Sequence, residues 1–68
     1  MIIPRREEIR MRREAQGMSK RKLAEKAGLP YNAIYRIEAG ESETTHPIRA
    51  RAIAAALGCE LEEVFICK

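Results

Sequence analysis

Apolar residues recur along this chain at the spacing of helices. In the middle of the sequence, Leu23, Ala24 and Ala27 fall on one face of a predicted helix. A second apolar face follows, where Ile34 and Ile37 lie three positions apart. No segment alternates apolar and polar residues for long enough to predict a strand. The pattern predicts an all-α fold with a core of Leu23, Leu29, Ile34, Ile37, Ile53, Leu57, Leu61 and Val64.

The limits of these two helices are marked by residues suited to helix ends. Ser19 is a favourable N-cap, because its hydroxyl accepts a hydrogen bond from a free N–H of the first turn. Gly28 stands where the first helix must stop, and glycine tolerates the left-handed conformation of such an exit. Pro30 suits the first position of the second helix, and Gly40 suits its end. Two short helices joined in this way are typical of a helix-turn-helix, whose second helix enters the DNA major groove.

Further helices are expected on both sides of this pair. A polar helix is expected over residues 4–16, opened by Pro4 and with Ile9 as its clearest apolar anchor. The alanine-rich segment predicts another helix over residues 45–58. A last helical turn is expected over residues 60–65.

A resemblance to a known family is carried by residues 19–40, which read S-K-R-K-L-A-E-K-A-G-L-P-Y-N-A-I-Y-R-I-E-A-G. This segment and its flanks, over about residues 9–65, resemble the phage Cro and repressor-type helix-turn-helix family, the XRE-like domains. The most specific part is the spacing L-A-x-x-x-G-x-x-x-x-x-I-x-x-I-E-x-G. The resemblance implies a lambda-repressor-like bundle of about five short helices, with residues 1–68 as a single DNA-binding domain.

The same resemblance implies an ion pair beneath the surface. In the family, an arginine at the place of Arg13 pairs with the glutamate at the place of Glu38. Such a pair would join the first helix to the end of the recognition helix. A buried pair would specify the fold rather than take part in catalysis, because removal of one partner leaves the other charge unpaired.

The charge is distributed unevenly between the two halves of the chain. The 68 residues carry a net charge of +3, but residues 1–36 carry net +6 and residues 37–68 carry net −3. The basic half contains the helix-turn-helix. We therefore expect that half to meet double-stranded DNA and the acidic half to face away or to contact a partner.

Geometry and resemblance together select the residues that would contact DNA. Side chains near the start of the recognition helix reach base edges, which indicates Tyr31, Asn32 and Arg36. Asparagine can bond adenine, and arginine can bond guanine, through two hydrogen bonds each. The expected phosphate contacts are Lys20, Arg21, Tyr35 and His46.

Two features depart from the family pattern. Lys20 stands where the family usually has glutamine, so a charged phosphate contact would replace a neutral one. Glu41 and Glu43 stand in a loop where relatives often carry lysine or arginine, which would weaken binding by that loop.

Other classes of function are disfavoured. A chain of 68 residues has a thin core and little room for an enclosed active site, so no enzyme is expected. Cys59, Cys67 and His46 match no zinc spacing, and neither a metal, a cofactor nor a small-molecule ligand is expected. Cys59 is expected to be a small buried hydrophobe and Cys67 a free thiol. There is no membrane span or secretory signal, which predicts a cytoplasmic protein of a prokaryotic or phage-infected cell.

The sequence thus predicts a sequence-specific transcriptional regulator, acting as a repressor on a two-fold operator. A Cro-like repressor and the antitoxin or control protein of a small operon both fit. The alternative is a protein-interaction module of the same fold that docks a partner protein through its acidic C-terminal half. A homodimer is expected, because one such module reads few base pairs. Its expected surface is the apolar C-terminal turn, Leu61, Val64, Phe65 and Ile66.

Overall fold

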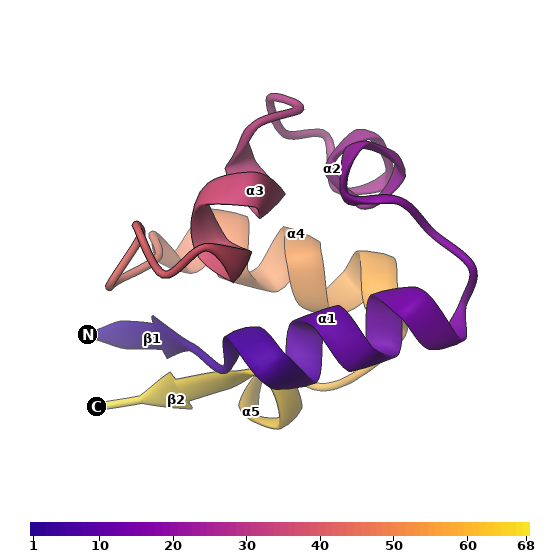
Figure 1. Ribbon diagram of the computed structural model, residues 1–68. Helices are drawn as coiled ribbons and strands as arrows, with labels where there is room; N and C mark the ends of the chain where they lie inside the picture. The colour runs from indigo at the N-terminus through magenta and orange to yellow at the C-terminus, as the bar shows by residue number, and fades with distance from the viewer.

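Five helices and two short strands make up the fold in the computed structural model, which describes residues 1–68 (Figure 1). In Figure 1, α2 and α3 lie together at one side of the molecule, β2 and α5 lie at the opposite side, and α4, α1 and β1 lie between them. The elements are β1 (Ile2–Pro4), α1 (Arg6–Ala15), α2 (Lys20–Ala27), α3 (Ala33–Glu38), α4 (Pro47–Leu57), α5 (Leu61–Val64) and β2 (Phe65–Cys67). The predicted five-helix bundle is confirmed, with a small sheet added to it.

The ends of α2 follow from the residues expected there. The hydroxyl oxygen of Ser19 accepts a hydrogen bond from the Lys22 N–H at 3.0 Å, so the serine caps the helix. Gly28 ends it in the left-handed conformation, with φ of 71°. A side chain at this position would strain the backbone, and this is the physical reason for glycine between the two helices.

The recognition helix α3 begins later than predicted. Ala33 donates its N–H to the Pro30 carbonyl at 3.0 Å, so Pro30 opens a turn instead of the first helical turn. Asn32 has φ of −86° and ψ of −2°, the values of the third residue of a type I turn. As a result, Tyr31 and Asn32 lie in the turn that leads into α3.

The expectation that the chain contains no strand was wrong. β1 and β2 pair antiparallel, with Ile3 opposite Ile66 and Pro4 opposite Phe65. Each strand has three residues, which is too short for alternation to be visible in the sequence. Pro4 therefore belongs to β1 and does not open α1. The strand tolerates it because proline, which lacks an N–H, is accepted at a sheet edge.

All five helices contribute to one apolar core, and both strands reach it. Ile9 comes from α1, Leu23 from α2, Ile34 from α3 and Ile53 from α4, and all four side chains are fully buried. The complete cluster is Ile9, Leu23, Ala24, Ile34, Ile37, Ala50, Ile53, Ala54, Ala56, Leu57, Val64 and Phe65. The predicted core is confirmed except for Leu29 and Leu61, which pack against this cluster while partly exposed.

The predicted dimer surface requires a correction. Val64 is 0% exposed and Phe65 is 1% exposed, because both side chains fill the core of their own chain. Leu61 packs against that core as well, and only Ile66 is exposed, at 40%. The C-terminal turn is apolar because a 68-residue fold uses it to close its core, so Val64 and Phe65 are not available to a partner.

An ion pair joins α1 to the end of α3. The Arg13 Nε donates to Glu38 Oε2 at 2.8 Å, and its Nη2 donates to Glu38 Oε1 at 3.0 Å. A third guanidinium nitrogen donates to the Met18 carbonyl at 2.8 Å. The two side chains are only 9% and 4% exposed, and hydrogen bonding to Glu38 raises the pKa of Arg13. Arg13 thus fixes the loop before α2 and the C-terminal end of α3 at once.

We predict that Glu38→Ala lowers the free energy of unfolding by about 3 kcal/mol, because it leaves the Arg13 charge buried and unpaired. Urea denaturation followed by circular dichroism measures this loss. Glu14→Ala is the matched control, since Glu14 approaches Arg13 only at 3.8 Å and is well exposed. An equal effect of both substitutions would contradict a special role for the pair.

Candidate nucleic-acid interface

The surface of α3 that faces away from the core forms the centre of the candidate interface. Ala24 of α2 is fully buried and has no bulk beyond Cβ, so α3 can pack closely across α2. Ile34 and Ile37 turn one face of α3 into the core. Because successive positions on a helix face different ways, this burial directs Tyr35 and Arg36 to the solvent.

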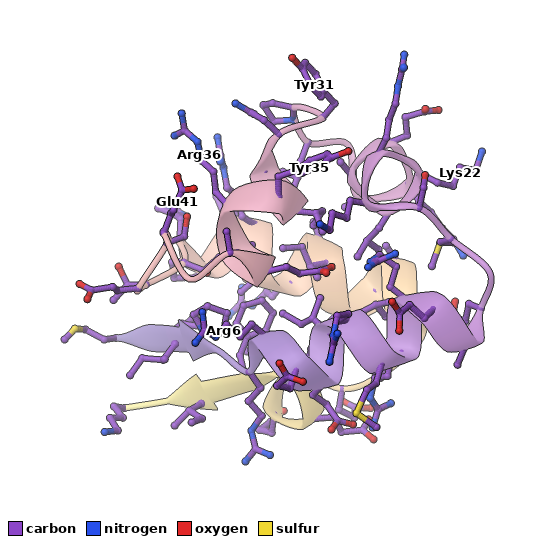
Figure 2. The ribbon with its side chains drawn as sticks, in the orientation of Figure 1. Arg6, Lys22, Tyr31, Tyr35, Arg36 and Glu41 are labelled. Atoms are coloured by element: carbon purple, nitrogen blue, oxygen red, sulfur yellow. The ribbon has the colours of Figure 1, made fainter.

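The structure places the three predicted base-reading residues on one exposed side. Tyr31 is 68% exposed, and both Tyr31 and Arg36 point away from the body of the molecule (Figure 2). Asn32 is the residue before α3, but its side chain makes no capping hydrogen bond. Arg36 makes no ion pair within 4.0 Å. The polar ends of Asn32 and Arg36 are therefore available to a ligand.

Two of the predicted phosphate contacts touch one another. The Nζ of Lys20, the first residue of α2, lies 4.8 Å from the centre of the Tyr35 ring. A cation at this distance over an aromatic ring is held by the negative face of the ring. Lys20 and Tyr35 thus form one unit that spans α2 and α3, a contact that their separation in the sequence does not reveal.

Arg21 and His46 are the other two predicted phosphate contacts. The Arg21 Nε is 4.0 Å from Glu25 Oε2, and both side chains are well exposed, so this pair holds Arg21 only weakly. His46 caps α4, where its Nδ1 accepts a hydrogen bond from the Ile48 N–H at 3.2 Å. The proton of the neutral imidazole is then on Nε2, which leaves a donor for an anion near the start of α4.

A cavity of about 250 Å³ with polar and apolar lining separates α3 from the start of α4. Asn32, Arg36, His46 and Arg49 line it, together with hydroxyl-bearing residues of the connecting loop and no carboxylate. Arg49 was not selected from the sequence. Its position in the first turn of α4, three residues after His46, was the signal that could have identified it.

The arginines of α1 are largely neutralised. Arg10 bonds Glu7 at 2.7 Å, and Arg12 bonds Glu8 at 3.0 Å and Glu63 at 3.1 Å. The hydrogen bond to Glu8 raises the pKa of Arg12. Arg5 and Arg6 form no ion pair, so the positive charge of the N-terminal half remains uncompensated at these two residues and around α2 and α3.

Other chemistry is sparse on this molecule. No group of three or more His, Cys, Asp or Glu side chains is placed to hold a metal ion. Cys59 is half-buried, and burial raises the pKa of its thiol, which disfavours the reactive thiolate. Cys67 is a free, exposed thiol. None of the helices has the length and apolarity needed to cross a membrane.

Comparison with known proteins agrees with this geometry. Residues 9–64 match the model of a helix-turn-helix family. Among solved structures, the chain is similar to the restriction-modification controller protein C.AhdI from Aeromonas hydrophila. The two share 28% sequence identity over 85% of this chain and 86% of the other, with a TM-score of 0.79. No curated protein sequence matches the chain.

The family match covers most of the chain, and it includes the buried alanine, the left-handed glycine and the two inward isoleucines described above. The similar solved structure is that of a regulator, and it reproduces the arrangement of the helices over most of both chains. The protein therefore belongs to the Cro and repressor-type (XRE-like) helix-turn-helix family of DNA-binding transcriptional regulators.

Proposed function

We propose that the protein is a sequence-specific repressor that binds a two-fold operator as a homodimer, with α3 of each chain in the major groove. The observation that carries this proposal is the exposed side of α3. There, Asn32 and Arg36 have no protein partner for their polar ends, and Tyr31 projects beyond them. Side chains of this kind at the start of a recognition helix meet base edges.

Base reading follows from the donors and acceptors of these side chains. Asn32 offers an acceptor and donors that match adenine N6 and N7, and Arg36 offers two donors that match guanine O6 and N7. Tyr31 packs on a thymine methyl group or bonds a phosphate. The operator half-site therefore contains both adenine and guanine within the reach of one helix.

Phosphate contacts on both sides orient α3 in the groove. Lys20 with Tyr35, and Arg21 beside them, meet the backbone at the start of α2, where free N–H groups favour an anion. His46 donates through Nε2 at the start of α4. These contacts carry no sequence information, but they set the register of the helix on DNA.

The homodimer is required by the size of the reading surface. One α3 of six residues contacts too few base pairs to select a site in a genome, and two chains on a two-fold operator multiply the selectivity. Of the four residues first expected at the dimer surface, Ile66 is exposed and Leu61 is partly exposed, whereas Val64 and Phe65 are buried. The partner must therefore meet other surface residues as well.

The biological setting follows from the type of regulator. A dimer bound at an operator excludes polymerase from that DNA, and occupancy follows the concentration of the protein. A role as the control protein of a small operon is supported by the likeness to a restriction-modification controller protein. We place the protein with the nucleoid in the cytoplasm of a prokaryotic or phage-infected cell, without a cofactor or enzymatic activity.

The interaction-module alternative is not favoured. Both the family and the similar solved structure are those of regulators, and the face of α3 retains side chains suited to base edges. Selection of bound sequences from a random DNA pool tests the proposal. Recovery of a two-fold consensus supports it, and recovery of no consensus at any salt concentration overturns it.

On the selected operator, Asn32→Ala and Arg36→Ala are each expected to weaken binding by about 1–3 kcal/mol, while affinity for random DNA stays nearly unchanged. The reason is that both side chains are assigned to base edges. Fluorescence anisotropy with both duplexes measures the difference. Equal losses on operator and random DNA would instead assign the residues to phosphates.

Lys20→Gln is expected to weaken binding to every sequence and to reduce the slope of log K against log salt by about one unit. Tyr35→Leu removes the ring under Lys20, so the two substitutions together should cost less than the sum of the single losses. Tyr35→Phe keeps the ring and serves as the control. Strict additivity of Lys20→Gln and Tyr35→Leu would show that the ring does not support the lysine.

Hydroxyl-radical footprinting on the selected operator is expected to show two protected half-sites whose centres are about one helical turn apart. Protection appears at both half-sites together as the protein concentration rises, because each bound chain stabilises the other. A single protected half-site with one-step binding would demonstrate a monomeric reader.

A further inference from the structure

A groove of about 460 Å³ runs between α1 and α3 and reaches the proposed phosphate contacts. Lys20 and Tyr35 line it, together with residues of α1 and, beyond the C-terminal end of α3, Glu41. The groove thus connects the start of α2 with the loop that follows the recognition helix. Its charged side chains are of both signs.

Most of these charges are already paired. Of the carboxylates in the groove, Glu7 bonds Arg10 at 2.7 Å, and Glu38 bonds Arg13 at 2.8 Å. Glu14 lies 3.8 Å from Arg13. Once the two close pairs are set aside, Lys20 is the remaining cation of the groove. Glu14 and Glu41 are the remaining carboxylates, and Glu41 forms no ion pair at all.

The backbone holds Glu41 close to the base-reading side of α3. Its N–H donates to the Arg36 carbonyl at 2.9 Å. Figure 2 shows the Glu41 side chain exposed below that of Arg36, on the edge of the molecule that carries α3. A negative charge therefore stands beside the surface that would receive DNA. The guanidinium of Arg6 lies nearby, against Gly40, but it forms no ion pair with Glu41.

The charge of Glu41 acts mainly on DNA near the C-terminal end of α3. Because α3 has six residues, its two ends are about 9 Å apart at the rise of an α-helix. The Debye length is about 8 Å at physiological ionic strength, so a charge at one end of α3 is largely screened at the other. Glu41 thus repels the phosphates that would lie nearest the end of α3, and this repulsion opposes the attraction of the DNA backbone by Lys20.

We propose that Glu41 is a negative determinant of DNA affinity, whose carboxylate offsets the attraction of Lys20 for the DNA backbone. This inference rests on the proposed function. It assigns to one side chain the weakening of DNA binding that the sequence predicted for the loop with Glu41 and Glu43. Its effect is that charge alone holds a single chain on DNA only weakly, so tight binding needs the base contacts of α3 as well.

A charge series at position 41 tests the proposal, with anisotropy measured on the selected operator and on a random duplex. At 0.1 M salt, Glu41→Gln is expected to raise affinity about 3- to 10-fold on both duplexes, and Glu41→Lys to raise it further. Glu41→Asp keeps the charge and should resemble the unaltered chain. The gain should shrink as salt increases, because the Debye length falls to about 3 Å at 1 M.

Two further variants separate charge from other causes. Glu62→Gln removes an equal charge from α5, at the side of the molecule opposite α3, and should leave affinity nearly unchanged (Figure 1). The combination Lys20→Gln with Glu41→Gln should bind both duplexes more tightly than Lys20→Gln alone, because the repulsion by Glu41 is removed in the absence of the lysine as well.

Several results would overturn the inference. Equal effects of Glu41→Gln and Glu62→Gln would show that only the net charge of the chain matters, and a gain with Glu41→Asp would show that loop shape matters instead. A loss of operator affinity with Glu41→Gln would mean that Glu41 accepts a hydrogen bond from a base. If the unaltered chain binds neither duplex at low salt, the proposed function itself fails, and the inference fails with it.

Discussion

Arg13 bonds three acceptors at the place where α1, the loop before α2 and the end of α3 meet. Two of the acceptors are the carboxylate oxygens of Glu38, and the third is the Met18 carbonyl. The six residues of α3 form too short a helix to be stable alone, so its orientation depends on what it packs against. Its inner face is held by apolar contacts, which have no directional preference. The planar guanidinium of Arg13 fixes the orientation of α3, because its hydrogen bonds to a carboxylate have fixed geometry.

The parts of this fold that could be predicted are positions where the backbone or the packing can accept only a few types of residue. Gly28 occupies the left-handed exit of α2, Ser19 caps the helix, and Ala24 lets α3 approach. Each demand is local in the sequence, or it repeats at helical spacing. These positions therefore predict the helix-turn-helix and the inner face of α3 from the sequence alone.

The parts that could not be predicted depend on contacts between distant segments. The pairing of β1 with β2 involves three residues on each side, and neither segment shows its own periodicity. The burial of Val64 and Phe65 follows from the way α5 and β2 close the core, whereas their sequence shows only that they are apolar. Likewise, the stacking of Lys20 on Tyr35 and the place of Arg49 beside His46 arise from how neighbouring helices pack.

The small sheet also bears on how the chain acquires its structure during synthesis. Ile2 pairs with Cys67, so β1 has no partner until nearly the whole of the described chain has left the ribosome. Contacts within the helix-turn-helix are close in sequence and can form early, whereas Phe65 reaches the core only at the end. Before α5 and β2 emerge, the nascent chain would therefore carry an assembled helix-turn-helix on an incompletely closed core. Such a chain would expose apolar core side chains to chaperones until α5 and β2 pack against α1 and α4.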